Sequence, residues 1–305
     1  MKKLVVKDNA LINASYSLTL AEQRLILLAI LEARHHSNEN NFNEPLFVSA
    51  ASYAESFEVE ANAAYKSLKK ASSDLLERRF TYGETIDGKI VKSTTRWVSE
   101  VGYAVNDAFV KIRFAQAVIP LITELERQFT SYELSQVAEL TSSYAVRLYE
   151  ILIAWRSTKK VPRIEIQDLR DRIGVLDDEY PLMERFKAKV LLPALEQINK
   201  HTDIIASYDQ HKTGRKITAI SFSFKFKENK EKTVTADAFI KLSPQQISMF
   251  SNKLAQLPEL GSQAPVGAST AEYADIIAAN LNDKNMQSYY TPLLAKVGYK
   301  PSKKR

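Results

Sequence analysis

The chain has 305 residues, of which 45% are hydrophobic and 26% are charged, so it has the composition of a folded protein with room for two ordinary domains. The absence of cysteine excludes disulfides, thiolate metal sites and cysteine nucleophiles. The longest apolar run, at 25–31, falls well short of the roughly 20 residues that span a bilayer, and no signal-peptide pattern follows Met1. We expect a cytoplasmic protein with no membrane segment.

Charge and histidine content narrow the function classes further. The net charge is +6 and the isoelectric point about 9.1, which suits a polyanionic partner without identifying one. The histidines have no metal-ligand spacing, so we expect no metal and no other cofactor. They are His35, His36, His201 and His211.

The first half of the chain shows the order helix, strand, helix, turn, helix and hairpin, which is that of a winged helix. Thr19 and Glu22 form a capping-box pattern at the first helix, and Asp87-Gly88 is typical of a hairpin turn. The predicted elements are a helix at 19–34, a polar loop at 37–44, a strand at 46–48, a helix at 49–57, a longer helix at 61–79 and strands at 80–85, 89–98 and 109–114.

The same order recurs about 116 residues downstream. Gly174 can supply the tight turn after a short helix, and Pro193 should kink or interrupt the long helix that follows. The predicted elements are a helix at 141–156, a strand at 163–166, helices at 167–173 and 181–200, and strands at 203–208 and 216–226 joined by a basic loop at 209–215. The fold class is therefore α+β, with two tandem winged-helix domains.

Beyond residue 232 the repeated order is lost. We predict a helix at 243–257, a linker rich in Gly, Pro and Ser at 258–269, two short helical stretches up to Tyr299 and a basic end at 301–305. This pattern divides the chain into winged-helix domains at 1–132 and 133–232 and a helical, partly flexible tail at 233–305. The sequence assigns no role to the tail.

Basic side chains lie on the faces of the two long helices that their own cores do not use. A helix that enters the major groove needs Lys and Arg for phosphates, and Arg, Asn or Gln for base edges, on such a face. The basic loop between the last two strands suits a wing that touches phosphate or the minor groove. For any single residue, a merely solvated side chain is an equal alternative. The candidate DNA contacts are Asn62, Lys66, Lys69, Lys70, Arg78, Arg79, Arg185, Lys187, Lys189, Lys200, Lys212, Arg215 and Lys216.

The strongest pattern for an enzyme is 83–89, which has the glycine and lysine spacing of a phosphate-binding loop. Such a loop needs Ser or Thr after the lysine and a helix behind it, but Ile90 follows Lys89 and both flanks are predicted strands. A DNA-nicking initiator would need a His-hydrophobic-His metal motif, which the sequence lacks. The acidic run 177–179 lies in a predicted turn, where solvated charge is the simplest interpretation. We predict no enzymatic activity.

Three segments carry a resemblance to a known family. They are the opening helix at 17–27, the run 142–150, and the run 186–191 followed by Gly214-Arg215-Lys216. These segments resemble the iteron-binding replication initiators, or Rep proteins, of bacterial plasmids. The run 142–150 carries a Ser-x-Tyr-x-x-Arg-Leu-Tyr-Glu pattern with one Ser doubled, and it is more specific than the opening helix. The similarity extends from about residue 4 to residue 227, whereas the segment beyond 232 departs from the family's motifs.

The resemblance implies a mechanism. Rep proteins bind directly repeated iterons as monomers, with two recognition helices in successive major grooves, and help to melt adjacent AT-rich DNA. As homodimers joined through the first domain they bind an inverted repeat and repress their own gene. Their host partners are the initiator DnaA, the helicase DnaB and chaperones. On this chain the helices at 61–79 and 181–200 become the recognition helices, and 144–156 supports the second.

Three other functions stay open from the sequence. A transcriptional regulator with the same two modules would bind operators but no array of direct repeats. An ATP-dependent or nicking enzyme would lose that activity on Lys89→Ala while DNA binding survived. A scaffold protein would carry the basic faces only as solvated charge.

Overall fold

The computed structural model describes residues 3–35, 44–104, 107–123, 129–227, 240, 242–257, 260 and 269–299. The chain forms two compact units, Met1–Lys227 and Glu228–Arg305. Most of the predicted loop at 37–44 and of the linker at 258–269, together with the basic end at 301–305, lies outside the described residues. No described helix is both long and apolar enough to span a membrane.

The first winged helix follows the predicted order, and the capping box at its first helix is confirmed. The Thr19 backbone N–H donates to Glu22 Oε2 at 2.6 Å, and the Glu22 N–H donates to Thr19 Oγ1 at 3.3 Å. The strands β2, β6 and β5 form an antiparallel sheet in that spatial order. The elements are α2 (Leu20–His35), β2 (Leu46–Ser49), α3 (Ala50–Phe57), α4 (Ala61–Leu75), β5 (Val98–Tyr103) and β6 (Phe109–Phe114).

Two boundaries in this domain were predicted wrongly. The helix α4 ends at Leu75 rather than at residue 79, because Leu75 is the last buried residue of its apolar face. The single strand predicted at 89–98 is two strands, β4 (Lys89–Arg96) and β5, in different sheets. They part at Trp97, which is fully buried and packs edge-to-face on Tyr16 with ring centroids 4.9 Å apart. Burial of this indole draws the chain into the core between the two sheets.

A separate two-stranded hairpin therefore follows α4. It consists of β3 (Arg79–Ile86) and β4, with the turn at Asp87 and Gly88 that the sequence predicts; both residues have positive φ. Thr81 pairs with Ser15 across an isolated bridge. The remaining strands of this half, β1 (Leu4–Asp8) and β7 (Phe129–Glu133), pair with each other, so the chain's first strand meets a segment more than 120 positions away. The sequence pattern does not predict this pairing.

The second winged helix repeats the plan. Its sheet has the spatial order β8-β10-β9, and α8 ends at Gly174, whose φ of +85° a side chain would strain. The elements are α7 (Ser143–Ile153), β8 (Lys160–Glu165), α8 (Ile166–Ile173), α9 (Met183–Phe186), a π-helical turn η2 (Lys187–Leu191), α10 (Leu192–His201), β9 (Ile204–Thr213) and β10 (Lys216–Phe226).

Pro193 interrupts the long helix, as predicted. The helix begins at Met183 rather than at 181, runs through η2, and resumes as α10 with Pro193 in its first turn. Proline has no N–H to donate to the carbonyl four residues earlier, and its ring crowds that carbonyl. A π-helical turn just before it accommodates the missing bond.

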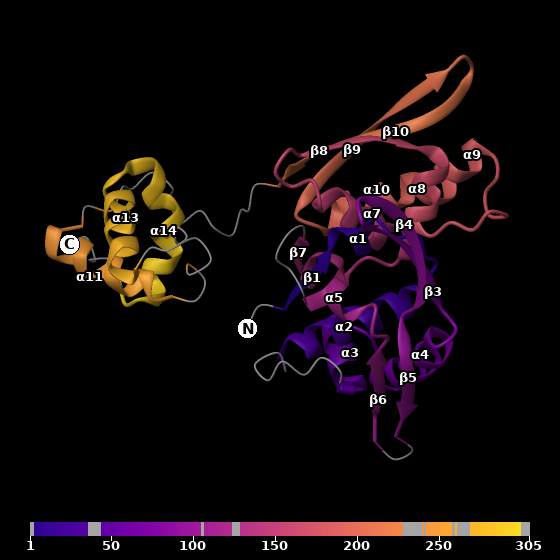
Figure 1. The fold of residues 1–305 in the computed structure, drawn as a ribbon, viewed down its shortest axis with the longest axis horizontal. Coiled ribbons are helices and arrows are strands. Elements are labelled where there is room, and N and C mark those ends of the chain that lie inside the picture. The colour runs from indigo at the N-terminus through magenta and orange to yellow at the C-terminus, as the bar shows by residue number, and fades with distance from the viewer. Residues whose placement is uncertain are drawn as a thin grey trace. The chain divides into compact units, whose positions relative to one another are not determined.

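The hairpin of the second domain is longer than predicted. Residues 209–213 belong to β9 rather than to a loop, and only Gly214 and Arg215 form the turn. The segment has no alternating apolar pattern because this part of the ribbon extends beyond the core and has no face to bury. Figure 1 shows the β9–β10 ribbon projecting from the unit that contains it.

The two winged helices share one hydrophobic core. Buried side chains from α2 and α4 belong to the same cluster as those from α7, α10 and β10. The boundary predicted at 132/133 falls inside β7, so the chain passes from one winged helix to the other without a linker at that point. Two short helices complete this half: α5 (Ile119–Thr123) and α6 (Ser135–Ala138).

The tail contains a helical unit with its own core. Ser243 and Ser269 each form a capping box, with Gln246 and Glu272 respectively. The core contains Phe250, Tyr273, Ile277, Tyr290 and Leu294. The helices are α11 (Pro244–Ala255), α13 (Thr270–Asn282) and α14 (Lys284–Lys296).

Candidate nucleic-acid interface

The helix α4 presents the predicted basic face of the first domain to solvent. Asn62 lies in its first turn, and Lys66, Lys69 and Lys70 are all exposed, whereas Ala64, Leu68, Ala71 and Leu75 on the other face are buried. The Lys69 ammonium lies 4.0 Å from the ring centroid of Tyr103, and Lys70 pairs with Asp74 at 2.6 Å. Both lysines remain exposed, and surface contacts of this kind are weak.

Arg78 and Arg79 differ in environment although they are neighbours. Arg78 pairs through Nε with Glu22 Oε1 at 2.9 Å, and the Glu22 side chain is fully buried. Arg79 is exposed at the start of β3 and has no ion pair among the described residues. Arg78 thus has a structural partner within the protein, and Arg79 is the better candidate for DNA.

The recognition helix of the second domain carries its basic residues on its first half. Arg185 in α9 and Lys189 in η2 are exposed, and Lys187 in η2 is partly exposed, whereas Phe186, Val190 and Leu191 are buried. None of the three basic side chains forms an ion pair or hydrogen bond within the described part of the chain. Lys200 lies near the end of α10, also exposed.

A buried arginine that sequence reasoning missed shapes the approach to this helix. Arg170 in α8 is 7% exposed and donates to the carbonyl oxygens of Tyr180 at 3.0 Å and Leu176 at 3.3 Å, with a further bond to that of Glu179. Its guanidinium also lies 5.3 Å from the centroid of the Phe186 ring in α9. Arg170 therefore orders the loop that leads from α8 to the recognition helix. An arginine between the buried positions Leu169 and Ile173 was the signal.

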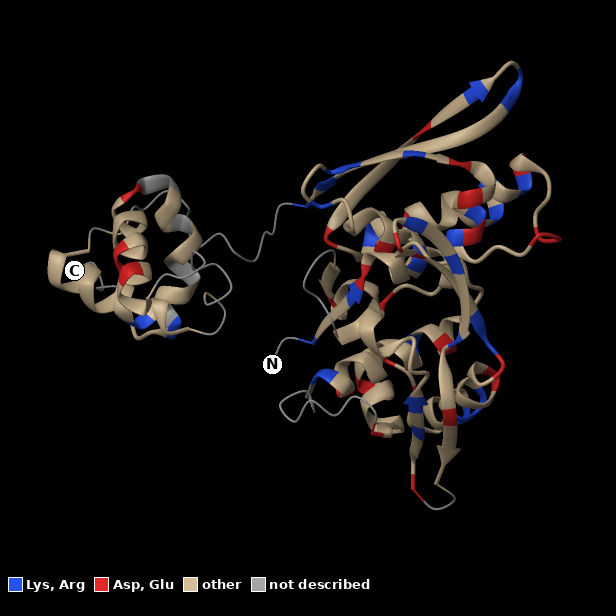
Figure 2. Cartoon of the chain, in the orientation of Figure 1, with Lys and Arg blue, Asp and Glu red and all other residues tan. Residues whose placement is uncertain are grey.

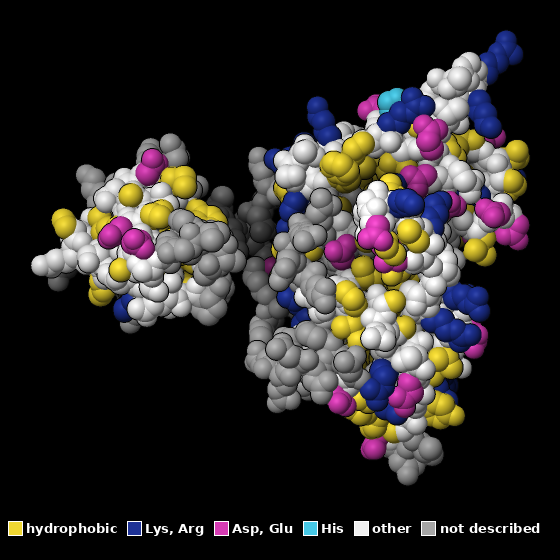
Figure 3. Space-filling model, viewed as in Figure 1, with side chains coloured by type: hydrophobic (Ala, Val, Ile, Leu, Met, Phe, Trp, Pro, Cys, Tyr) yellow, Lys and Arg dark blue, Asp and Glu magenta, His cyan; other side chains and the backbone are white. Residues whose placement is uncertain are grey.

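The tip of the β9–β10 hairpin is basic. Lys212 lies on β9 near the tip, Arg215 is in the turn and Lys216 begins β10. All three are exposed. Figure 2 shows these blue segments at the end of the projecting ribbon. In the same view α4, α9 and the hairpin tip all lie on the right-hand side of the unit, and Figure 3 shows basic side chains gathered along that side.

The structure does not build a phosphate-binding loop at 83–89. These residues form the β3–β4 hairpin, with Asp87 and Gly88 at its turn, so Lys89 begins a strand and not the helix that a phosphate-binding loop requires. Within the described part of the chain, no group of three or more His, Asp or Glu side chains has the arrangement of a metal site.

Comparison with known proteins agrees with this architecture. Residues 4–153 match the family model "Initiator Replication protein, WH1", and residues 165–224 match "Initiator Rep protein, WH2". An uncharacterized 27.6 kDa protein of Escherichia coli is 25% identical over 228 residues, 72% of this chain and 95% of that protein. A replication initiation protein of E. coli is 25% identical over 262 residues, 83% of this chain and 78% of that protein.

A solved structure has the same fold. The crystal structure of the Pi initiator protein in complex with iteron DNA aligns with 75% of this chain and 99% of that chain, with a TM-score of 0.60 and 20% sequence identity. The two family matches together cover most of the unit that contains both winged helices. The chain belongs to the Rep family of replication initiator proteins, with its WH1 and WH2 domains in tandem.

Proposed function

We propose that this protein initiates plasmid replication by binding directly repeated iterons at the origin. The observation that carries the proposal is the pairing of two helix-turn-helix units in one compact body, each with exposed basic side chains on its recognition helix. The fold it shares with a Pi initiator bound to iteron DNA supports the same ligand. No catalytic step belongs to the proposal.

In this proposal each of the two recognition helices contacts its own major groove of the DNA. The face of α4 with Asn62, Lys66 and Lys69 contacts one major groove, and Arg185, Lys187 and Lys189 contact the next. Arg79 and the hairpin-tip residues Lys212, Arg215 and Lys216 contact phosphates at the flanks, together with Lys70 and Lys200. Arg78 is assigned no DNA contact in this proposal, because its Nε pairs with the buried Glu22.

The proposal includes the wider behaviour of Rep proteins. The monomer binds iterons, promotes opening of the origin and supports helicase loading, with DnaA, DnaB and chaperones as partners. A homodimer in equilibrium with the monomer represses the protein's own gene at an inverted repeat. These events place the protein in the bacterial cytoplasm, on plasmid DNA.

Footprinting tests the core of the proposal. The purified protein is applied to DNA that flanks its own gene, at 50 and 200 mM salt, because phosphate-driven affinity falls with salt. We expect regularly spaced protection over direct repeats. Protection of a single inverted repeat alone would indicate a transcriptional regulator, and protection nowhere would overturn both functions.

A substitution tests the recognition helix. Arg185→Ala should weaken binding to the protected site by about 1 to 3 kcal/mol if the side chain reads a base, and should weaken binding to random DNA much less. Lys253→Ala, in α11 of the tail, is the matched control and should change neither. Equal losses on the two DNAs for Arg185→Ala would remove its base-reading role.

A further inference from the structure

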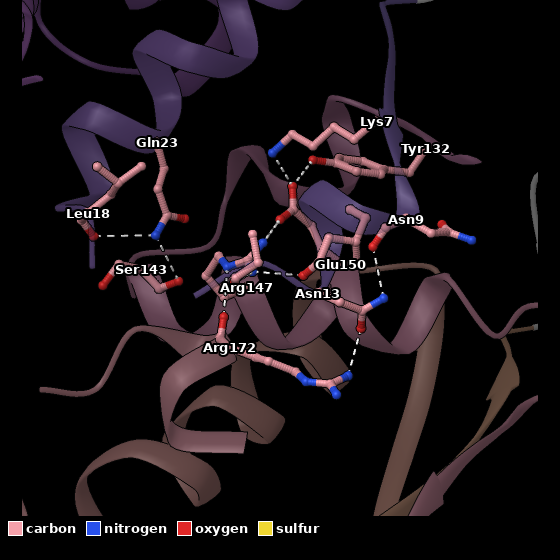
Figure 4. Close-up of polar contacts among 12 residues, drawn as sticks. Lys7, Asn9, Asn13, Leu18, Gln23, Tyr132, Ser143, Arg147, Glu150 and Arg172 are labelled. Carbon is pink, nitrogen blue, oxygen red and sulfur yellow. Dashed lines mark hydrogen bonds and ion pairs between the residues drawn. The ribbon is translucent and has the colours of Figure 1, made fainter. Parts of the chain in front are cut away.

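A buried polar cluster joins the two winged helices. It is centred on Arg147 and Glu150 of α7, whose side chains are 1% and 0% exposed. The helix α7 packs against α8 and α10 of the second winged helix, and its two charged side chains point toward segments from the start of the chain. Figure 4 shows this arrangement. Both residues lie in the run 142–150 that resembles the Rep proteins.

Arg147 binds three segments at once. Its Nη2 donates to the carbonyl oxygens of Ile12 at 2.8 Å and Ala14 at 3.1 Å, both in the first domain. Its Nε donates to the Arg172 carbonyl at 3.0 Å, in α8, the helix that precedes the recognition helix. Its Nη1 donates to Glu150 Oε2 at 2.7 Å. One guanidinium therefore links the first domain to the helix-turn-helix of the second.

Glu150 continues the link toward β1 and β7. Its Oε1 accepts a bond from Lys7 Nζ at 2.6 Å and another from the Tyr132 hydroxyl at 2.5 Å. Burial would raise the pKa of the Glu150 carboxyl, but the charges of Lys7 and Arg147 hold it below its usual range. The carboxylate is thus ionised at neutral pH. It accepts hydrogen bonds from Lys7 and Tyr132 at Oε1 and from Arg147 at Oε2.

Two further contacts lie at the same interface between the two winged helices, which we call the seam. Both involve residues of α8 or of the turn that follows it. Arg172 Nη1 donates to Asn13 Oδ1 at 2.7 Å. A Cβ atom on Gly174 would lie 2.6 Å from the Tyr16 carbonyl oxygen, so the turn after α8 approaches the first domain as closely as a glycine permits. The domains are therefore fixed at several separate points, which restricts rotation as well as translation.

The chemistry of the seam favours one orientation. Apolar surfaces can slide or rotate over each other at small cost, but hydrogen bonds to buried charges require set distances and angles. A buried ion pair contributes little net stability over an apolar packing of the same volume, so its main effect here is on geometry. Movement of one domain against the other would break the bonds that these two buried charges make outside α7, from Arg147 to the carbonyls of Ile12 and Ala14 and from Lys7 and Tyr132 to Glu150.

We propose that Arg147 and Glu150 are positioning residues that fix the second winged helix against the first and thereby set the spacing between the two DNA half-sites that the chain binds. The proposal rests on the proposed DNA-binding function for its consequence but not for its geometry. Neither residue touches DNA, because both are buried.

The geometry can be measured without DNA. The chain has no cysteine, so Ser73→Cys in α4 and Glu196→Cys in α10, both exposed, give two specific spin-label sites on the two recognition helices. Pulsed electron spin resonance should give one narrow distance distribution for this labelled protein. Arg147→Met should broaden it, whereas Arg163→Ala, on β8, should not. An equally narrow, unshifted distribution in Arg147→Met would overturn the proposal.

The consequence is measured on DNA. The duplex protected in the footprint is compared with one that carries two extra base pairs at its centre, which rotates the half-sites by about 70°. The original protein should bind the longer duplex at least about tenfold more weakly, and Arg147→Met should reduce that penalty to about threefold or less. The proposal would be overturned if the unsubstituted protein bound both duplexes equally. It would also be overturned if Arg147→Met lost as much affinity for the longer duplex as the unsubstituted protein does.

A milder variant covers the case in which Arg147→Met does not fold. Asn13→Ala removes the exposed contact to Arg172 and an exposed, local bond from Asn13 Nδ2 to the Asn9 carbonyl, so it should fold normally. It should broaden the spin-label distribution and reduce the spacing penalty by about twofold. No change in either measurement would count against the proposal. If no DNA is protected at all, the DNA-binding function fails, while the spin-label result still decides the positioning role.

Discussion

Arg78 Nε donates to Glu22 Oε1 across 2.9 Å, and this ion pair joins the turn between α4 and β3 to the start of α2. Glu22 is fully buried and also accepts the Thr19 N–H, so its carboxylate has one charged partner and one capping bond. The basic residue that follows the first recognition helix therefore has a partner within the protein, whereas its sequence context predicts DNA contact.

Arg78→Ala and Arg79→Ala should separate stability from binding. Arg78→Ala leaves the buried Glu22 charge unpaired and should lower the free energy of unfolding by about 2 kcal/mol, less than for a fully buried pair because Arg78 is partly exposed. Arg79→Ala should leave stability unchanged and weaken DNA binding. Urea unfolding and DNA titration of both variants check this. If Arg78→Ala instead weakened DNA binding and left stability unchanged, Arg78 would be the DNA contact.

Gly174→Ala should destabilise the protein by roughly 1 to 3 kcal/mol, because φ is +85° and the new Cβ would clash with the Tyr16 carbonyl oxygen. Gly214→Ala is the matched control: its φ is +62° but no atom lies within 4 Å of the new Cβ. The difference between their thermal midpoints therefore isolates the interdomain clash. Equal midpoints would mean that the seam yields at little cost.

Lys212→Ala should reduce the slope of log affinity against log salt concentration by about 0.9, the effect of losing one phosphate contact. Its specificity for the protected site over random DNA should stay the same, because the hairpin tip contacts no base edge in our proposal. Titrations at four salt concentrations on both DNAs measure the slope. An unchanged slope would place the hairpin tip away from DNA.

The effect of Glu150→Gln on the free energy of unfolding should depend on pH. The folded-state pKa of Glu150 is below its usual range, so the carboxylate stabilises the fold above the pKa of an unfolded Glu, about 4.3, and this contribution is lost as the pH falls toward the folded value. The variant should be about 3 to 5 kcal/mol less stable at pH 7. That gap should narrow below pH 4 in urea unfolding, and a constant gap would contradict the assignment.

A chain that ends at Lys227 should bind the protected DNA as tightly as the full chain. Both family matches end before this residue, and the helical unit beyond it has a core of its own. The comparison is made by titration at one salt concentration. A loss of more than about tenfold in affinity would show that the tail contributes to DNA binding.

Local sequence signals predicted much of the fold. The capping box at Thr19, the turn at Asp87-Gly88, the helix end at Gly174 and the interruption at Pro193 each depend on a few neighbouring residues, and all are confirmed. The alternation of helical and strand periodicity was enough to show two winged helices. The candidate basic residues were visible for the same reason, since exposure of a helix face follows from the apolar face opposite.

Tertiary structure alone decided what depends on distant partners. The end of α4, the division of β4 from β5 at Trp97 and the pairing of β1 with β7 depend on what packs against them from elsewhere in the chain. The partners of three charged side chains also come from distant parts of the chain. Arg78 pairs with Glu22, and Arg147 and Glu150 of α7 bind residues of the first domain. Periodicity and capping determine local structure because they involve neighbouring residues, whereas a charged side chain acquires its role from the partner that folding brings to it.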